Sequence, residues 1–250
     1  MESHGQMYQD KVSNYTRGRI GYAPQVSELI AALAPSAGAT VADMGAGTGI
    51  FSQALLELGF TVYAVESSSA MLDAAQAHLG DQAGFHAIAA TAEQSGLPEN
   101  TIDLVTAASA FHWFHTQAFQ AECRRILKPG GRVFLLVNRR RDDDEFAREH
   151  HMLCMRFCRA FAGLHQGADK TDAAAASFFP NGFARECFPF ELRYTAERFF
   201  ERCLSSSYSP GKNEPNYSEY CDALQAMIDR YAVDGWIIAP NDTVVWHGQF

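Results

Sequence analysis

Short apolar runs alternate with longer amphipathic stretches up to about residue 140. Five of the runs are apolar without strict alternation, which is typical of parallel strands covered on both faces. They predict strands at Thr40–Met44, Phe60–Val65, Gly84–Ala89, Ile102–Ala107 and Arg132–Val137. Apolar residues at helical spacing predict helices at Pro24–Ala34, Gly49–Leu58, Ser69–Leu79 and Thr116–Leu127. We therefore expect stacked βα units in this part of the chain.

The pattern changes after Val137. Helical spacing returns at Asp144–Phe161, Ala196–Leu204 and Tyr217–Ala232, and strands are predicted at Phe183–Tyr194 and Thr243–Phe250. Regular alternation is lost in the Gly-, Ala- and Asp-rich stretch 163–176. Because no obvious linker interrupts the chain, we interpret residues 1–250 as a single domain, with a core at 15–137. Residues 138–250 then supply late strands and helical inserts that cover the substrate.

Composition and charge narrow the classes of protein to which this chain can belong. The chain has 250 residues, 47% of them hydrophobic, and a formal net charge of −9, which indicates a globular protein and disfavours a binder of nucleic acid. The longest aliphatic runs are far shorter than the roughly 20 residues that cross a bilayer, and the N-terminus lacks the order of a secretory signal. We therefore expect a cytoplasmic protein without a membrane partner. The six cysteines are scattered, so mostly buried thiols are expected rather than disulfides.

A glycine-rich segment follows the first predicted strand directly. This glycine loop, Asp43–Gly49, reads Asp-Met-Gly-Ala-Gly-Thr-Gly and opens into a helix. Glycines suit a tight turn and a close approach of backbone to a ligand. A dinucleotide-binding loop would need a small residue at position 50, where this chain has Ile50. The spacing therefore disfavours NAD and FAD.

An acidic residue closes the second predicted strand. Glu66 lies about 20 residues beyond the first glycine, the spacing at which a carboxylate accepts hydrogen bonds from ribose hydroxyls. The glycine loop and Glu66 together predict an adenosine site without a pyrophosphate clamp. Each feature has an alternative explanation when it is considered alone. The loop is then an ordinary strand-to-helix connection, and Glu66 is a solvated surface carboxylate.

Several further motifs follow in order, and together with the loop they resemble the class I S-adenosylmethionine-dependent methyltransferases. The resemblance covers roughly residues 15–137. The motifs after the glycine loop are Glu66 with Ser69–Leu72, Thr91–Glu93, Leu97-Pro98, Ile102–Val105, Ser109–Phe114 and Leu127–Gly131. The resemblance is general to a group of small-molecule methyltransferases that includes trans-aconitate and quinone-pathway enzymes, and it selects neither substrate. With it we expect a Rossmann-like α/β fold, a seven-stranded and mostly parallel sheet with one late antiparallel strand and helices on both faces.

The resemblance also implies which residues hold S-adenosylmethionine. In its pattern Met71 lies against the adenine, Ala92 and Glu93 meet the adenine edge, and Ser109 contacts the cofactor near the sulfonium through its backbone. Thr91 replaces the Asp that many relatives carry, which leaves Glu93 or backbone groups as the adenine partner. Arg19 or Arg17 could pair with the methionyl carboxylate. The cofactor-binding residues predicted in all are Tyr15, Arg19, Asp43, Gly45, Ala46, Gly47, Glu66, Met71, Ala92, Glu93 and Ser109.

The cofactor already supplies the activated leaving group, so the protein mainly positions and desolvates the nucleophile. A general base helps only where the acceptor must lose a proton, and His112 is the candidate. Its alternative is a structural histidine that bonds a neighbour or stacks on Trp113. The residues predicted to contact substrate are Trp113, Phe114, Asn138, Arg139 and Tyr208.

Two further groups of residues, one after the fifth predicted strand and one on the helix that follows, have competing interpretations. Arg139–Arg141 could hold an acidic acceptor, but Asp142–Glu145 follows at once and favours pairing and helix capping. His150, Cys154 and Cys158 share a helix face, and core packing is favoured over zinc, so no metal is expected.

These observations predict S-adenosylmethionine-dependent methyl transfer to a small molecule by a monomer or homodimer, with oxygen, nitrogen or carbon as the acceptor atom. The alternatives are a protein or RNA methyltransferase and a cofactor-binding subunit that lacks turnover.

Overall fold

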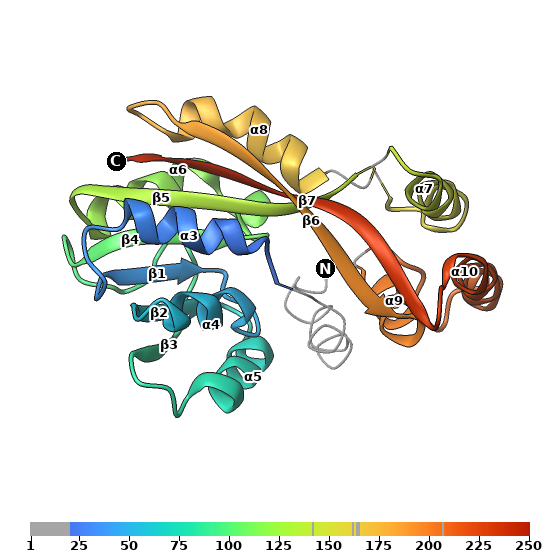
Figure 1. Ribbon diagram of the computed structural model, residues 1–250. Helices are drawn as coiled ribbons and strands as arrows, with labels where there is room; N and C mark the ends of the chain where they lie inside the picture. The colour runs from blue at the N-terminus through green and yellow to red at the C-terminus, as the bar shows by residue number, and fades with distance from the viewer. Residues whose placement is uncertain (1–20, 142, 162, 164–165, 207) are drawn as a thin grey trace. The chain divides into compact units, whose positions relative to one another are not determined.

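The computed structural model describes residues 21–141, 143–161, 163, 166–206 and 208–250 (Figure 1). Tyr15, Arg17 and Arg19, three residues of the predicted cofactor cover, lie outside the described residues. Within the described residues no helix is both long enough and apolar enough to cross a membrane.

Within the described residues, seven strands form one sheet in the order β3-β2-β1-β4-β5-β7-β6. The strands are β1 (Thr40–Met44), β2 (Thr61–Glu66), β3 (Phe85–Ala89), β4 (Ile102–Ala108), β5 (Leu127–Arg140), β6 (Ala184–Thr195) and β7 (Trp236–Gln249). Strands β1 to β5 pair in parallel, and β7 is antiparallel to its neighbours. The predicted fold class is therefore confirmed, including the late antiparallel strand.

Strand β1 lies between β2 and β4, so the strand order reverses at this point. Val41 of β1 pairs with Val62 on one side and with Leu104 on the other. In open α/β sheets, ligands bind outside the carboxyl ends of the strands where the order reverses. The glycine loop leaves β1 at that edge.

Helices follow the strands closely. They are α3 (Pro24–Leu33), α4 (Ile50–Glu57), α5 (Ser69–Leu79), the 3-10 helix η1 (Phe111–Trp113), α6 (Thr116–Ile126), α7 (Glu145–Phe157), α8 (Gln166–Phe178), α9 (Ala196–Leu204) and α10 (Tyr217–Tyr231). Helix α4 packs on β1 and β2, and α5 packs on β2 and β3.

The contacts divide the described chain into two compact units. The sheet unit contains residues 21–138, 167–188 and 243–250. The helical unit contains the described residues of 139–166 and 189–242. Strands β5, β6 and β7 contribute residues to both. The interpretation of 1–250 as one methyltransferase domain stays a prediction.

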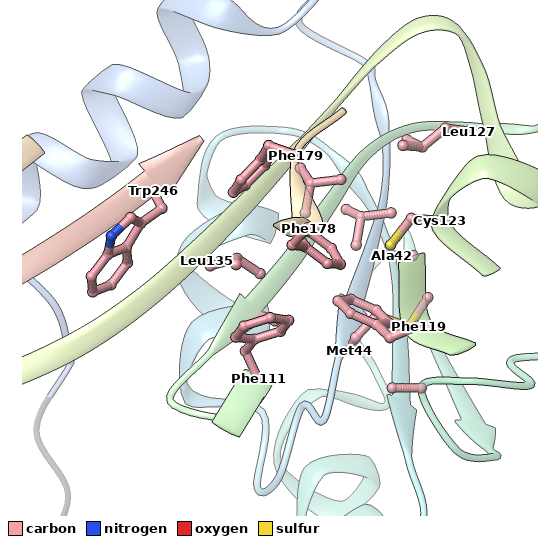
Figure 2. Close-up of a cluster of buried hydrophobic side chains, with 14 of the residues drawn as sticks. Ala42, Met44, Phe111, Phe119, Cys123, Leu127, Leu135, Phe178, Phe179 and Trp246 are labelled. Carbon is pink, nitrogen blue, oxygen red and sulfur yellow. The ribbon is translucent and has the colours of Figure 1, made fainter. Parts of the chain in front are cut away.

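Each unit has its own apolar core. In the sheet unit, Phe111, Phe119 and Phe178 pack together with Leu135 and Trp246 over the sheet (Figure 2). The rings of Phe119 and Phe178 stack at 5.4 Å between centroids, and Phe111 meets Phe178 edge-on at 5.0 Å. Phe111 thereby anchors η1, the element that carries His112 and Trp113.

Four predicted elements differ from the structure. Strand β5 runs from Leu127 to Arg140 rather than from Arg132 to Val137, so it includes the Lys-Pro-Gly-Gly segment. The stretch 163–176, where no regular pattern was found, contains most of helix α8, whose Ala168, Ala175 and Phe178 are buried. Strand β7 begins at Trp236 rather than Thr243, although Pro240 and Asn241 are turn-type residues. Helix α7 ends at Phe157 rather than Phe161, and Cys158 has extended backbone angles.

Candidate functional site

The glycine loop turns sharply away from β1. The backbone N–H groups of Gly45 and Ala46 both donate to the carbonyl of Val65, at 2.8 and 3.1 Å, so the loop is fastened to the neighbouring strand. Gly45 and Gly47 have φ of 68° and 59°, a region that side chains disfavour.

Neighbouring residues leave no room for a side chain at the first glycine. A Cβ on Gly45 would lie 2.7 Å from the Cβ of Ala110 and 3.1 Å from Cζ of Phe114. Both neighbours follow β4, so the loops after β1 and β4 are in contact. Glycine at position 45 is therefore required by packing as well as by backbone conformation.

Glu66 closes β2 beside the loop, as predicted, but its carboxylate also has backbone partners. One oxygen accepts a hydrogen bond from the N–H of Gly47 at 2.9 Å, and the other accepts from the N–H of Ser68 at 2.8 Å. A carboxylate oxygen has two acceptor positions, so each retains one for a ligand hydroxyl. The side chain is thus oriented in advance of binding.

Two hydroxyl groups near this carboxylate fit a polar ligand. The side-chain oxygens of Thr48 and Ser68 are buried, and within the described part of the chain neither has a hydrogen-bond partner. A buried unpaired hydroxyl costs about 1–3 kcal/mol, which a polar ligand recovers. The loop residues therefore fit the nucleoside that the spacing predicted.

Asp43 lies beneath the loop rather than at its surface. It is 1% exposed, and its two oxygens accept hydrogen bonds from Ser52 at 2.7 Å and from Thr106 at 2.8 Å. Burial raises the pKa of Asp43 to about 6, and the negative charge of Glu66 acts in the same direction. Asp43 ties β1, α4 and β4 together and so positions the loop.

The predicted adenine contacts lie in the loops and helices after β2 and β3. Met71, in the first turn of α5, and Ala92 are both buried. Glu93 accepts a hydrogen bond from the N–H of His115 at 2.9 Å, which joins the loop after β3 to the start of α6. Thr91 is exposed.

Ser109 follows β4 with a positive φ of 55°, which is uncommon for a residue with a side chain. Its N–H donates to the carbonyl of Leu136 at 2.7 Å, and its hydroxyl accepts from the hydroxyl of Tyr22 at 3.1 Å. Tyr22 was not among the residues predicted from the sequence. The only sequence signal for it is an aromatic residue just ahead of the first helix and beside the predicted cofactor cover.

Asn138, near the end of β5, holds the segment that contains Tyr22 and leads into α3. Its amide donates to the carbonyl of Gly21 at 3.0 Å and accepts from the hydroxyl of Thr243 at 2.7 Å. The Thr243 hydroxyl in turn accepts from the N–H of Ala23 at 3.0 Å. Asn138 therefore holds the segment that precedes α3 in this structure. Its contact with substrate stays a prediction.

His112 and Trp113 lie on the 3-10 helix after β4, with ring centroids 4.9 Å apart. A Cβ on Gly167 would lie 3.3 Å from Nδ1 of His112, so the first turn of α8 runs close to this ring. Trp113 is 47% exposed, and the ammonium of Lys170 lies 6.0 Å from its ring. Phe114 packs edge-on against Phe119.

The two remaining predicted substrate residues belong to the other compact unit. Arg139 is half-buried there, and Tyr208 meets Phe161 edge-on at 5.0 Å. The capping interpretation of the acidic run is confirmed, because Asp144 caps α7 through the N–H of Ala147 and Arg141 pairs with Asp143. In the described residues, no three His, Cys, Asp or Glu side chains are arranged to hold a metal ion.

Residues 42–135 match a family model described as a methyltransferase domain. This segment runs from β1 into β5 and contains the glycine loop, Glu66 and Ser109, so the chain is similar to methyltransferase domains over the residues that carry the predicted resemblance.

Curated relatives are also similar to part of this chain. An uncharacterised methyltransferase of Mycobacterium tuberculosis strain H37Rv is 39% identical over 138 residues, covering 55% of this chain and 54% of the relative. The chain thus spans about half the length of the curated relatives it matches.

Solved structures show the same fold. A protein from Anaeromyxobacter dehalogenans, proposed to be a type II methyltransferase, superimposes with a TM-score of 0.65 at 22% identity, over 92% of this chain and 97% of that one. A phosphoethanolamine N-methyltransferase from Haemonchus contortus superimposes with a TM-score of 0.50 at 16% identity, over 92% and 53%. That enzyme was solved with phosphomonomethylethanolamine and S-adenosylhomocysteine.

Proposed function

We propose that this protein transfers a methyl group from S-adenosylmethionine to a small-molecule acceptor by in-line displacement. The observation that carries the proposal is the Glu66 carboxylate, which is oriented by Gly47 and Ser68 and keeps one acceptor position on each oxygen. Two such positions suit the two hydroxyls of a ribose. The methyltransferase domain and the structural likeness to an enzyme that binds S-adenosylhomocysteine support the same cofactor.

Other residues of the sheet unit would shape the rest of the cofactor site. Met71 and Ala92 supply an apolar surface for the adenine, and Glu93 retains an acceptor position for its amino group. Gly45 and Ala46 allow the backbone to approach closely. Ser109, held by Tyr22, presents backbone at the carboxyl end of β4. Tyr15 and Arg19 stay predicted partners of the methionyl part.

When bound, S-adenosylmethionine supplies a methyl group on a positively charged sulfur, which is a good leaving group. Residues in η1 and directly after it act on the acceptor. Trp113 and Phe114 give an aromatic wall that suits an apolar or planar molecule, and Asn138, Arg139 and Tyr208 stay proposed contacts. His112 accepts the proton when the acceptor is a hydroxyl or a phenol.

The acidic composition and the choice of a small acceptor fit a cytoplasmic enzyme that acts as a monomer or homodimer, without nucleic acid or membrane. The cytoplasmic location, the oligomeric state and the partners are all part of this proposal.

Calorimetric titration with S-adenosylhomocysteine tests the cofactor site. Glu66→Gln removes the charge and replaces one acceptor oxygen by an amide donor while keeping the shape, so we expect affinity to fall roughly tenfold to a hundredfold. Glu57→Gln, on the exposed face of α4, is the matched control and should bind as the wild type does. No heat of binding in the wild type, or equal affinity in the two variants, would overturn the proposal.

The reaction is tested by measuring the release of S-adenosylhomocysteine with a panel of small molecules that offer a hydroxyl, an amine or a carbon as acceptor. We expect turnover on at least one small molecule. His112→Gln should then lower turnover on a hydroxyl or phenol roughly a hundredfold while cofactor affinity stays unchanged. The exposed His78→Gln on α5 is the control. Tight binding with no turnover on any acceptor would indicate a non-catalytic binding subunit instead.

A further inference from the structure

A buried carboxylate on helix α6 has no part in the proposed methyl transfer. Glu122 is 7% exposed, and its hydrogen-bond partners, like Glu122 itself, belong to the sheet unit. One of those partners lies in the segment after β3, which we call the β3 loop and define as residues 91–97. The same loop carries Ala92 and Glu93, the predicted partners of the adenine. The contacts of Glu122 therefore bear on how the loop presents these two residues.

One oxygen of Glu122 orders Ser95, which is 1% exposed. This Oε1 accepts hydrogen bonds from the Ser95 N–H at 2.9 Å and from the Ser95 hydroxyl at 2.5 Å. The Ser95 oxygen accepts in turn from the N–H of Leu97 at 3.2 Å. Buried donors in a loop need partners other than a strand ladder. The Glu122 carboxylate is that partner for the middle of the β3 loop.

Arg125 holds the Glu122 carboxylate in a fixed direction. Its Nη2 donates to Oε1 at 2.7 Å and its Nε donates to Oε2 at 2.8 Å, so the guanidinium and the carboxylate meet side by side. Such a two-point contact fixes both the position and the plane of the carboxylate. Burial by itself raises the pKa of Glu122, but the hydrogen bonds from Arg125 and Ser95 outweigh it, and the pKa lies below its usual value. The carboxylate is therefore charged at neutral pH.

Glu93 makes a second connection between the β3 loop and α6. Its carboxylate accepts from the N–H of His115 at 2.9 Å, and Nδ1 of His115 caps the helix by accepting from the N–H of Ala118. His115 and Glu122 are about two helical turns apart along α6. The loop is therefore attached to the helix at two points, with Glu93 at one and Ser95 at the other.

Apolar packing does not fix the loop in this way. Ala92 and Leu97 are buried in the same core as Phe119 and Cys123 of α6. Apolar contacts have no preferred direction, whereas a hydrogen bond weakens steeply when its angle departs far from linear. The core therefore holds the loop close to α6, and the hydrogen bonds of Glu122 set the direction in which its polar groups point.

A hydrogen bond to the amino group of adenine needs an acceptor at a defined place. The Glu93 carboxylate has one bond to His115 and keeps acceptor positions for a ligand. We propose that Glu122 is a positioning residue for adenine: it holds the β3 loop through Ser95 so that the Glu93 carboxylate faces the amino group of the base. The inference rests on the proposed function and deepens it, since it assigns selection of the base to a residue that does not touch the cofactor.

Calorimetric titration of the full chain with two ligands tests the proposal. They are S-adenosylhomocysteine and S-inosylhomocysteine, in which a carbonyl oxygen replaces the amino group of the base. A carbonyl opposite a carboxylate brings two acceptors together, so we expect the wild type to bind the inosyl compound at least roughly tenfold more weakly. We call this ratio of the two affinities the base preference. Equal affinity of the wild type for both ligands would overturn the proposal.

Variants at Glu122 and Ser95 assign the base preference to their contact. Glu122→Gln weakens the hold on both Ser95 and Arg125, so we expect the base preference to fall at least roughly fivefold. Ser95→Ala removes one of the two bonds to Glu122, leaves the Arg125 pair in place, and should lower the base preference roughly threefold. Glu99→Gln removes the same charge from an exposed position shortly before β4 and should keep the wild-type preference.

The base preference separates positioning from a purely structural role. Both affinities are measured on folded protein, so a loss of stability alone leaves their ratio unchanged. An unchanged base preference in Glu122→Gln and Ser95→Ala, or an equal fall in Glu99→Gln, would contradict the proposal. If Glu122→Gln does not fold, Ser95→Ala decides, because it keeps the ion pair of Glu122 and Arg125. A wild type that binds neither ligand would overturn the methyltransferase proposal, and this inference with it.

Discussion

Asp43 shows how a single residue supports the glycine loop without facing it. Its carboxylate is buried and receives two hydroxyl hydrogen bonds, from α4 and from β4. Those bonds favour the charged form, yet desolvation outweighs them and the pKa rises to about 6. Holding a buried acid at the end of β1 therefore lowers the stability of the folded state at neutral pH.

The pH dependence of stability follows from this pKa. The ordinary value is 3.8, so between about 4 and 6 the folded state binds more protons than the unfolded state. The free energy of unfolding should therefore fall by up to about 3 kcal/mol as pH rises through this window. In Asp43→Asn this component should vanish, which urea unfolding from pH 4 to 8 measures.

The exposed Asp73→Asn on α5 is the control for that series and should keep the wild-type dependence on pH. Identical slopes for Asp43→Asn and the wild type would show that Asp43 has an ordinary pKa.

Gly45 and Gly130 allow backbone strain to be separated from crowding. Both have positive φ, but a Cβ on Gly45 would meet Ala110 at 2.7 Å, whereas nothing lies within 4 Å of one on Gly130. Gly130→Ala should cost about 1 kcal/mol of stability from the backbone alone. Gly45→Ala should cost roughly 2–4 kcal/mol and weaken binding of S-adenosylhomocysteine, because Ala110 or the loop must move.

Urea unfolding and calorimetry measure the two effects in the two glycine variants. Equal losses of stability, with cofactor affinity intact in both, would show that the loop accommodates a methyl group at position 45.

At the scale of elements, the first half of the chain was predicted closely and the second half less so. Helices α5 and α9 have the predicted bounds, because apolar residues recur at helical spacing throughout each. Helix α8 was missed, because its buried face consists largely of alanines, whose spacing gives little contrast with the exposed face. Alanine's strong helix propensity was the remaining signal.

Helix α7 begins at an aspartate that caps it. Asp144 accepts a hydrogen bond from the N–H of Ala147 at 2.6 Å, whereas its neighbour Asp143 forms an exposed ion pair with Arg141. Asp144→Ala should destabilise the protein by about 1 kcal/mol, since a backbone donor at the helix start loses its partner. Asp143→Ala should change stability by less than about 0.5 kcal/mol. Thermal unfolding of both variants tests the difference, and equal effects would argue against capping.

For the whole molecule, the order of the strands decides where chemistry is possible. The reversal at β1 brings the glycine loop, Glu66 and Ser109 to one edge of the sheet unit, although they are separated along the chain. Phe111, the first residue of η1, packs with Phe119 and Phe178 in the aromatic core of the same unit (Figure 2). The helical unit has its own apolar core.

Hydrogen exchange can show which unit responds to the cofactor product. S-adenosylhomocysteine at a hundred times its dissociation constant should stabilise the protein by about 2.7 kcal/mol. We expect amide protection to rise at 43–49, 66–71 and around Ser109. Protection confined to 139–161 and 189–206 would contradict the proposed cofactor site.

The local pattern of apolar residues, glycines and acids was sufficient to predict the sheet, the loop and Glu66, because strand and helix periodicity and turn chemistry act over short spans of chain. It could not show that Asp43 is enclosed, that Tyr22 holds Ser109, or that Arg140 lies over the ring of Phe199. Those contacts join residues distant in the chain, and only the packing of strands and helices decides which of them meet and which charges are removed from water.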